Sequence, residues 1–230
     1  MKKIIIGLAI IVLFTVGMYL MGAEGLEDEI YTGYSQVDDR GGYVEAEVSL
    51  EAGQITEVNL TEFIDTGEVK GPDYDGIDEF HEAMEELPER FKEANDYDVD
   101  VYSGATGTSN KAIEAVKMAL EKAEGVSDFD GTFFGASAIT ERGNRGIAHV
   151  TVEGSEIKNV VLKEIDDIDE GEFKGEDYGL DEFHDAKETL PERMIEADSY
   201  DVDTYSGATG SSERWIEAVK DALGKLDIVH

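Results

Sequence analysis

The string YDVDVYSGATG at residues 97–107 returns as YDVDTYSGATG at residues 200–210, and the two copies differ only where Thr204 replaces Val101. The sequence around this string repeats as well: the segment at 42–60 resembles the segment at 145–162, and DEFH and LPER recur in the same order. A period of about one hundred residues is too long for a solenoid unit and suits a small domain. We therefore expect two tandem copies of one domain, at residues 31–124 and 131–227. The short polar link between them is expected to leave their arrangement flexible.

Hydrophobic periodicity predicts an α+β fold for each copy. Apolar and polar residues alternate over 44–50, a turn follows, and apolar residues continue over 55–60, which is typical of an antiparallel hairpin. A helical stripe then places apolar residues three or four apart, at Ile77, Phe80, Met84, Leu87 and Phe91. Because Pro88 interrupts this stripe, we expect a kink or two short helices there. A last helix should follow the glycine-rich string, so that a small antiparallel sheet packs with helices.

Composition excludes several classes of function. The 230 residues include 54 Asp and Glu against 19 Lys and Arg, a formal charge of -35. Such an excess of negative charge repels phosphate backbones, so nucleic acid is not expected as a partner. The chain has no cysteine, which excludes disulfides, iron–sulfur clusters, thiolate metal sites and haem attached through thiols. The acidity suits either an extracellular surface or a high-salt habitat and does not choose between them.

The first 23 residues predict a membrane segment. Lys2 and Lys3 precede an uncharged run at 4–23, which as a helix would reach about 30 Å, the thickness of a bilayer's hydrocarbon core. The two lysines indicate a cytoplasmic N-terminus, so the rest of the chain would lie outside the cytoplasm. A cleaved signal peptide is the alternative, although the run is longer than the usual apolar region of such a peptide.

The repeated string itself predicts a phosphate site. Gly104 and Gly107 allow positive φ angles and a close approach of the backbone, and Thr108 or Ser109 is expected to cap the following helix. Free N–H groups at the positive end of that helix would then lie beside Thr106. A plain turn with a helix cap would use the same residue types, but here the string occurs at the same place in both copies.

DVDVYSGATGTS and DVDTYSGATGSS resemble the flavinylation motif, Asp-x-x-Ser/Thr-Gly-Ala-Thr, of the FMN-binding domain family. That family includes a subunit of the sodium-translocating NADH:quinone reductase and the related subunit of the Rnf complex. The resemblance extends to the hairpin and the LPER segment. It implies FMN joined by a phosphoester to Thr106 and Thr209, attached from FAD by a separate magnesium-dependent flavin transferase. The other residues that it places at the cofactor are Asp100, Tyr102, Ser103, Gly104, Ala105 and Thr108, and in the second copy Asp203, Tyr205, Ser206, Gly207, Ala208 and Ser211.

Two positions depart from the pattern of the family. Tyr102 and Tyr205 stand where an aliphatic residue is expected, and Gly107 and Gly210 where a larger one is expected. These differences would alter how a flavin ring packs, but they leave the acceptor threonines in place.

The resemblance and the N-terminal segment together imply a membrane-anchored electron carrier outside the cytoplasm, with two covalent FMN groups and no substrate chemistry of its own. Its partners would be the flavin transferase, a membrane reductase or quinol oxidoreductase as electron donor, an external acceptor or second carrier, and the lipid bilayer. Two alternatives remain open: a module that binds flavin noncovalently, and an acidic structural protein of the cell surface.

Other residues have simpler interpretations. His81 and His184 are expected to lie on a helix surface or to be partly buried, and Arg90 and Arg193 to pair with the abundant carboxylates. Trp215 has the helical spacing of a core residue, and no metal site is expected.

Overall fold

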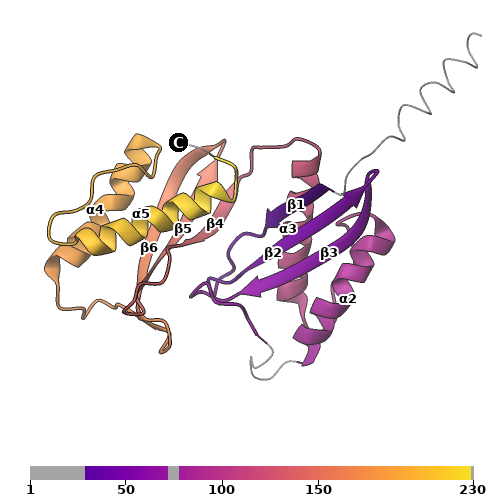
Figure 1. The fold of residues 1–230 in the computed structure, drawn as a ribbon, viewed down its shortest axis with the longest axis horizontal. Coiled ribbons are helices and arrows are strands. Elements are labelled where there is room, and N and C mark those ends of the chain that lie inside the picture. The colour runs from indigo at the N-terminus through magenta and orange to yellow at the C-terminus, as the bar shows by residue number, and fades with distance from the viewer. Residues whose placement is uncertain (1–28, 72–77, 229–230) are drawn as a thin grey trace, which may run out of the picture.

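The computed structural model describes residues 29–71 and 78–228, in which the two sequence copies form two units of the same construction (Figure 1). In the first repeat, strands β1 (Glu29–Tyr34), β2 (Tyr43–Glu51) and β3 (Gln54–Phe63) form an antiparallel sheet in the order β1-β2-β3. Helices α2 (Asp78–Ala94) and α3 (Thr106–Ala123) follow. The predicted α+β class is confirmed.

The second repeat has the same order of elements and one short additional strand. Its sheet runs β4 (Gly131–Ala136), β5 (Arg145–Glu153), β6 (Glu156–Asp167) and β7 (Glu172–Phe173), with all neighbours antiparallel. Helices α4 (Asp181–Ala197) and α5 (Thr209–Gly224) complete it.

The predicted hairpins are confirmed, and each is closed by a two-residue turn. Ala52 and Gly53 have φ angles of 52° and 78°, and Gly154 and Ser155 have 59° and 62°. Two consecutive positive φ angles give a turn whose twist matches that of the flanking strands. The outer strands β1 and β4 were not expected from the periodicity.

Both helices of each repeat pack on one face of its sheet. Alternate residues of β2, Val44, Ala46 and Val48, are fully buried against α2 and α3. Helix α3 approaches β1 so closely that a Cβ atom on Gly33 would lie 2.1 Å from the carbonyl oxygen of Ala115. The absence of a side chain at Gly33 and the small side chains of α3 therefore allow this helix to pack directly on the sheet.

The expected division into two short helices at Pro88 is wrong. Helix α2 continues through Pro88, and α4 continues through Pro191 in the same way. The proline removes one backbone hydrogen bond, but Ala83, Leu87 and Phe91 on either side of it are buried in one core. Tertiary packing of the apolar stripe thus holds the helix continuous.

The two repeats share a packed interface, so the expected flexible tandem is also wrong. The ring of Tyr43 stacks on Phe63 of its own repeat at 4.7 Å and on Phe134 of the other at 4.9 Å, between ring centroids. The backbone N–H of Val37 donates to the carbonyl of Thr132 at 3.0 Å. Within the polar link, Phe129 is buried in the core of the second repeat. The link is therefore anchored to the folded unit that follows it.

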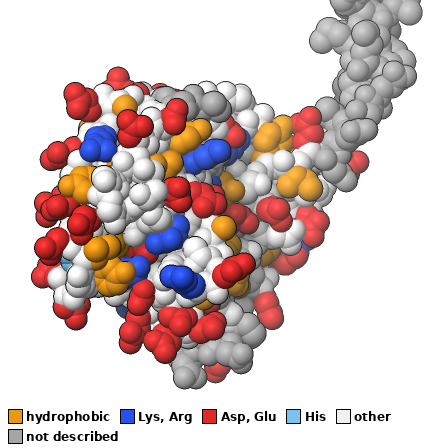
Figure 2. Space-filling model, turned by 60° about the vertical axis from the view of Figure 1, so that its left-hand side comes forward, with side chains coloured by type: hydrophobic (Ala, Val, Ile, Leu, Met, Phe, Trp, Pro, Cys, Tyr) orange, Lys and Arg blue, Asp and Glu red, His pale blue; other side chains and the backbone are white. Residues whose placement is uncertain are grey.

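The predicted membrane segment at 1–23 lies outside the described residues. Within residues 29–71 and 78–228, no helix has the length and apolar character needed to cross a bilayer. Acidic side chains are spread over the face drawn in Figure 2, around a smaller group of Lys and Arg.

Candidate functional site

The loop that joins the two helices, α2 to α3 in the first repeat and α4 to α5 in the second, has the same geometry in both repeats. The N–H of Ala105 donates to the carbonyl of Tyr102 at 3.2 Å, and that of Ala208 donates to Tyr205 at 3.1 Å. Gly104 and Gly207 both have a φ angle of +90°. We call residues 102–106 and 205–209 the acceptor loops. Each ends at a threonine that is the first residue of a helix and is exposed to solvent.

The expected helix caps are absent. Ala105 and Ala208 occupy the capping positions, and neither helix start has a side-chain capping bond. Thr108 and Ser211 lie in the first turn of their helices and are buried. At the start of α3 and of α5, the first backbone N–H groups therefore donate no capping hydrogen bond to a side chain of the loop. These N–H groups are the positive ends of the helix dipoles.

Gly104 and Gly107 have different roles, although the sequence suggested one role for both. A Cβ atom on Gly104 would lie 2.7 Å from Cγ of Glu79, which packs against the loop from the start of α2. Gly107 lies in the first turn of α3, without a positive φ angle, and a Cβ atom there would meet nothing within 4 Å. Position 104 thus requires glycine, because of its positive φ angle and the contact with Glu79. Gly107 instead leaves open space beside Thr106.

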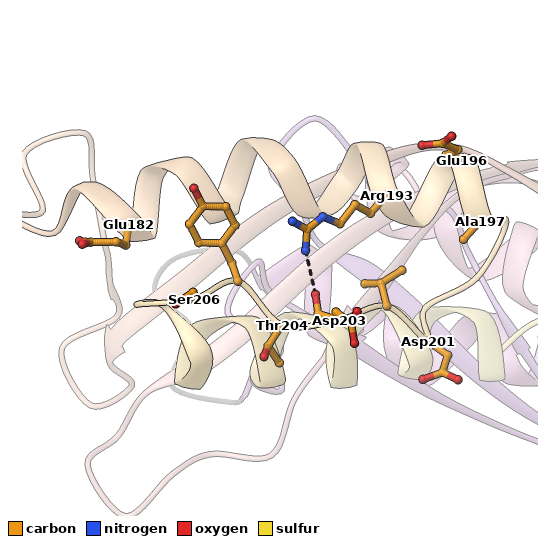
Figure 3. A pocket seen from close by; sticks show the side chains of 10 residues that line it. Glu182, Arg193, Glu196, Ala197, Asp201, Asp203, Thr204 and Ser206 are labelled. Carbon is orange, nitrogen blue, oxygen red and sulfur yellow. Dashed lines mark hydrogen bonds between the residues drawn. The ribbon is translucent and has the colours of Figure 1, made fainter.

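An arginine from the LPER segment holds the backbone that leads into each acceptor loop. Arg90 donates to the carbonyl oxygen of Asp100 at 2.6 Å, and Arg193 donates to that of Asp203 at 3.1 Å (Figure 3). Arg90 also pairs with Glu86, as the sequence suggested. The side chains of Asp100 and Asp203 are exposed. The two arginines therefore position the loops through their backbone.

Tyr102 and Tyr205 are half-buried beside these arginines. The Arg90 guanidinium lies 5.5 Å from the centre of the Tyr102 ring, and the Tyr102 hydroxyl donates to Glu82 at 2.6 Å. This hydrogen bond to a carboxylate raises the pKa of Tyr102. Tyr205 lines a groove of about 970 Å³ between its acceptor loop and α4, the pocket drawn in Figure 3.

The tertiary structure adds a group of residues that the sequence did not reveal. In the first repeat, Oε1 of the buried Glu62 lies 3.0 Å from Nζ of Lys111 and 3.1 Å from Nζ of Lys70. In the second, Oε1 of Glu164 lies 2.7 Å from Lys174 and 2.7 Å from Arg214. We call these the carboxylate–cation groups. Both groups are formed by residues at matching positions of the two repeats. Aligning the repeats and marking the positions that carry the same charge in both would have revealed these residues from the sequence.

Each carboxylate–cation group contains an unsatisfied oxygen. Oε2 of Glu62 and Oε2 of Glu164 are buried and have no hydrogen-bond partner among the described residues. The two residues are only 4% and 1% exposed. Burial would lower the pKa of Lys174, but the hydrogen bond and charge of Glu164 raise it overall, so this lysine stays protonated. A buried carboxylate oxygen of this kind calls for a donor, which a ligand hydroxyl or N–H can supply.

Cavities join these groups to the helix starts. In the first repeat, a cavity of about 410 Å³ is bounded by the acceptor loop and by Glu62, Lys70 and Lys111. In the second, a cavity of about 570 Å³ is bounded by Thr209, Gly210, Lys174 and Arg214. Each cavity therefore combines an exposed threonine, an uncapped helix start and three cations, because Arg40 lines the first and Arg142 the second.

The remaining candidates lie away from these cavities. Among the described residues, His81 and His184 line neither cavity, and Nε2 of His184 lies 2.7 Å from the carbonyl oxygen of Tyr178. Trp215 is fully buried and donates to the carbonyl of Lys163 at 2.8 Å, as a core residue. Ser103 and Ser206 are exposed in the acceptor loops.

This arrangement suits an anionic cofactor that carries both a phosphate and hydrogen-bond donors. Helix N–H groups and cations complement a phosphate, and the free oxygens of Glu62 and Glu164 complement donors. The fold and the two sites thus define a class: a tandem of α+β cofactor-binding domains, each with a threonine at a helix start.

The chain belongs to the FMN-binding domain family, whose model matches it twice, at residues 40–121 and 138–224. Both matches contain the complete acceptor loop of their repeat. The crystal structure of the CPE2226 protein from Clostridium perfringens is 28% identical, covers 44% of this chain and 91% of its own, and has a TM-score of 0.39. No curated protein matches the chain.

Proposed function

We propose that this protein is a membrane-anchored electron carrier outside the cytoplasm, with FMN bound through a phosphoester to Thr106 and to Thr209. One observation carries the proposal: in both repeats of an FMN-binding domain protein, an exposed threonine begins an uncapped helix beside a buried carboxylate–cation group. The first 23 residues, with two lysines before an apolar run, support the anchor and its orientation.

The chemistry of attachment uses the threonine hydroxyl. Its oxygen would bond to the phosphorus of the FMN half of FAD, the pyrophosphate bond would break, AMP would leave with the bridging oxygen, and the hydroxyl proton would be released. A separate flavin transferase would supply the catalytic groups. The exposed position of Thr106 and Thr209 gives such an enzyme access to the hydroxyl.

The protein's own residues would then hold the product. A phosphodiester has one negative charge, which the N–H groups at the start of α3 and α5 and the nearby cations complement. Glu62, which lines the first cavity, would accept a hydrogen bond from the cofactor through its unpartnered oxygen. Bound flavin supplies the uptake and release of one or two electrons.

A covalent bond has a physical advantage outside a cell. A site with a dissociation constant of about 1 nM and an association rate of about 10⁶ M⁻¹s⁻¹ would release its ligand at roughly 10⁻³ s⁻¹. Ligand released there would diffuse away. We propose a carrier without catalysis of its own, which takes electrons from a membrane reductase or quinol oxidoreductase and passes them to an external acceptor.

Mass spectrometry of the full chain, expressed with and without a flavin transferase, tests the attachment. We expect one FMN increment on the peptide with Thr106 and one on the peptide with Thr209, only when the transferase is present. Thr106→Ala and Thr209→Ala should each remove their own increment. Thr108→Ser is the matched control, because the second repeat has Ser211 at that position, and it should keep both increments.

Two outcomes would contradict the proposal. Flavin that leaves on acid precipitation, with neither peptide modified, would indicate a noncovalent flavin module. A colourless protein in the presence of an active transferase would favour a structural surface protein.

A further inference from the structure

The two sites differ in the turn that covers the carboxylate–cation group. Oδ1 of Asp38 accepts the N–H groups of Arg40 and Gly42, each at 3.0 Å. At the matching position of the second repeat, Oγ1 of Thr140 accepts those of Arg142 and Asn144, at 3.4 and 3.1 Å. Asp38 and Thr140 therefore stabilise the same turn in the same way.

Asp38 has a second oxygen, and Thr140 does not. Oδ2 of Asp38 lies 2.6 Å from Nζ of Lys111, which also contacts Glu62 at 3.0 Å. Lys111 is thus shared between two carboxylates. Arg214, its counterpart, pairs with one carboxylate among the described residues, Glu164, and its buried Nε has no partner there.

The two cations also lie differently with respect to the helix starts. Nη1 of Arg214 lies 3.5 Å from the place that a Cβ atom would take on Gly210, the residue after the acceptor Thr209. No atom lies within 4 Å of the equivalent place on Gly107. Nζ of Lys111 instead lies 3.4 Å from a Cβ position on Gly42, in the turn that contains Asp38. Arg214 is therefore beside the start of its helix, and Lys111 is drawn toward the turn.

The other charged residues of the two cavities largely correspond. Asp39 and Arg40 line the first cavity, and Glu141 and Arg142 line the second. Lys174 has an extra neighbour, Asp166, at 3.5 Å, but that carboxylate is 60% exposed and does not line the cavity, so water screens it. Besides Glu62, Asp38 is thus the one carboxylate among the described residues that both lines one of these cavities and forms an ion pair with a cation of its carboxylate–cation group.

We propose that the second repeat binds the flavin phosphate more tightly than the first, and that Asp38 sets this difference. An arginine that lies beside the helix start and pairs with one carboxylate forms a stronger contact with a phosphate than a lysine already held by two carboxylates. The inference rests on the proposed function, since it assigns unequal strength to the two flavin sites. It further implies that a limiting amount of transferase modifies Thr209 before Thr106.

Titration of the full chain in detergent, produced without transferase, tests the binding. FMN and inorganic phosphate are added separately, and the backbone amides of Gly107 and Gly210 are followed by NMR as reporters of the two helix starts. We expect the Gly210 signal to saturate at a concentration about three- to tenfold lower than the Gly107 signal.

An exchange of the two turn residues makes the test specific. Asp38→Thr should tighten binding at Gly107 toward the value at Gly210, and Thr140→Asp should weaken binding at Gly210. Each new residue is native to the other repeat and keeps the turn's hydrogen bonds, so the fold should be retained. Asp39→Thr is the control: it removes the same charge one residue away, from an exposed side chain of the same cavity, and should have a much smaller effect.

Equal saturation at the two glycines, or an order that the exchange leaves unchanged, would overturn the inference, and so would a failure of both probes to bind. A second experiment, the time course of FMN attachment to the two peptides followed by mass spectrometry, distinguishes failure of this inference from failure of the proposed function. Modification of both threonines at equal rates would overturn the inference alone. Modification of neither would overturn the proposed function as well.

Discussion

The hydroxyl of Ser109 and the backbone nitrogen of Tyr102 lie 2.9 Å apart, and this contact closes the first acceptor loop. The same hydroxyl donates to the carbonyl of Ala105 at 2.9 Å. Ser212 makes the equivalent bonds to Tyr205 and Ala208, at 3.1 and 2.8 Å. Since both serines are fully buried, one side chain in each repeat ties the loop to the helix that it precedes.

Ser109→Ala should therefore destabilise the first repeat. The Tyr102 N–H would lose its partner inside the protein, which costs about 1–3 kcal/mol. Chemical denaturation measures the change. Asn110→Ala, at the next and exposed position of the helix, should change the free energy of unfolding by only about 0.5 kcal/mol. Equal effects of the two substitutions would show that the Ser109 hydroxyl has no structural role.

Alanine should have opposite effects at the two glycines of the first site. Gly104→Ala places a side chain at a φ angle of +90° and against Glu79, so we expect a loss of about 1–3 kcal/mol. Gly107→Ala lies in open space in the first turn of α3 and should stabilise the helix by about 0.5–1 kcal/mol. Thermal unfolding of the two variants distinguishes them. A similar loss in both would contradict the separate roles of the glycines.

Tyr43→Ala should uncouple the two repeats. The ring of Tyr43 is buried between Phe63 and Phe134, and its removal leaves a cavity that costs about 3–5 kcal/mol. Trp215 is the single tryptophan and lies in the second repeat, so its fluorescence reports on that repeat alone, while circular dichroism reports on both. We expect the two signals to coincide in the wild type and to separate in the variant.

Tyr43→Phe keeps the stacked ring and serves as the control. Its two signals should still coincide. If they also coincide in Tyr43→Ala, the repeats are coupled through other contacts.

His149 should make stability depend on pH. Burial lowers its pKa to about 4, and the positive charge of Lys163 acts in the same direction. An unfolded chain, with an ordinary histidine pKa of about 6.5, binds the proton first as the pH falls. The contribution of His149 is therefore complete above pH 6.5 and declines toward pH 4, by about 1–2 kcal/mol after allowance for partial exposure.

The comparison with His149→Gln isolates this contribution from that of the many carboxylates. Urea denaturation of both proteins between pH 7 and pH 4 should show the wild type losing stability relative to the variant. A difference that stays constant over this range would indicate that the folded and unfolded proteins bind the proton equally well at His149.

Local patterns predicted the central hairpins and the helices because such elements depend on residues a few positions apart. They failed where distant residues decide the outcome. Pro88 stays inside a helix because Ala83, Leu87 and Phe91 pack in one core. The start of α3 lacks the expected cap because Ser109 bonds to the loop instead. Phe129, within a link that reads as polar, is buried in the second repeat.

The sequence by itself determined the duplication, the α+β class and the resemblance to FMN-binding domains, and it predicted Thr106 and Thr209 as acceptors. All of these depend on contiguous residues. Only the tertiary structure decided what surrounds the threonines, because Lys111 meets Glu62 across 49 positions of the chain and Asp38 across 73. Ion pairs between such distant residues arise only when the sheet and helix pack together. The sequence shows that Asp38 stands where the second repeat has Thr140, but only this packing shows that Asp38 contacts Lys111.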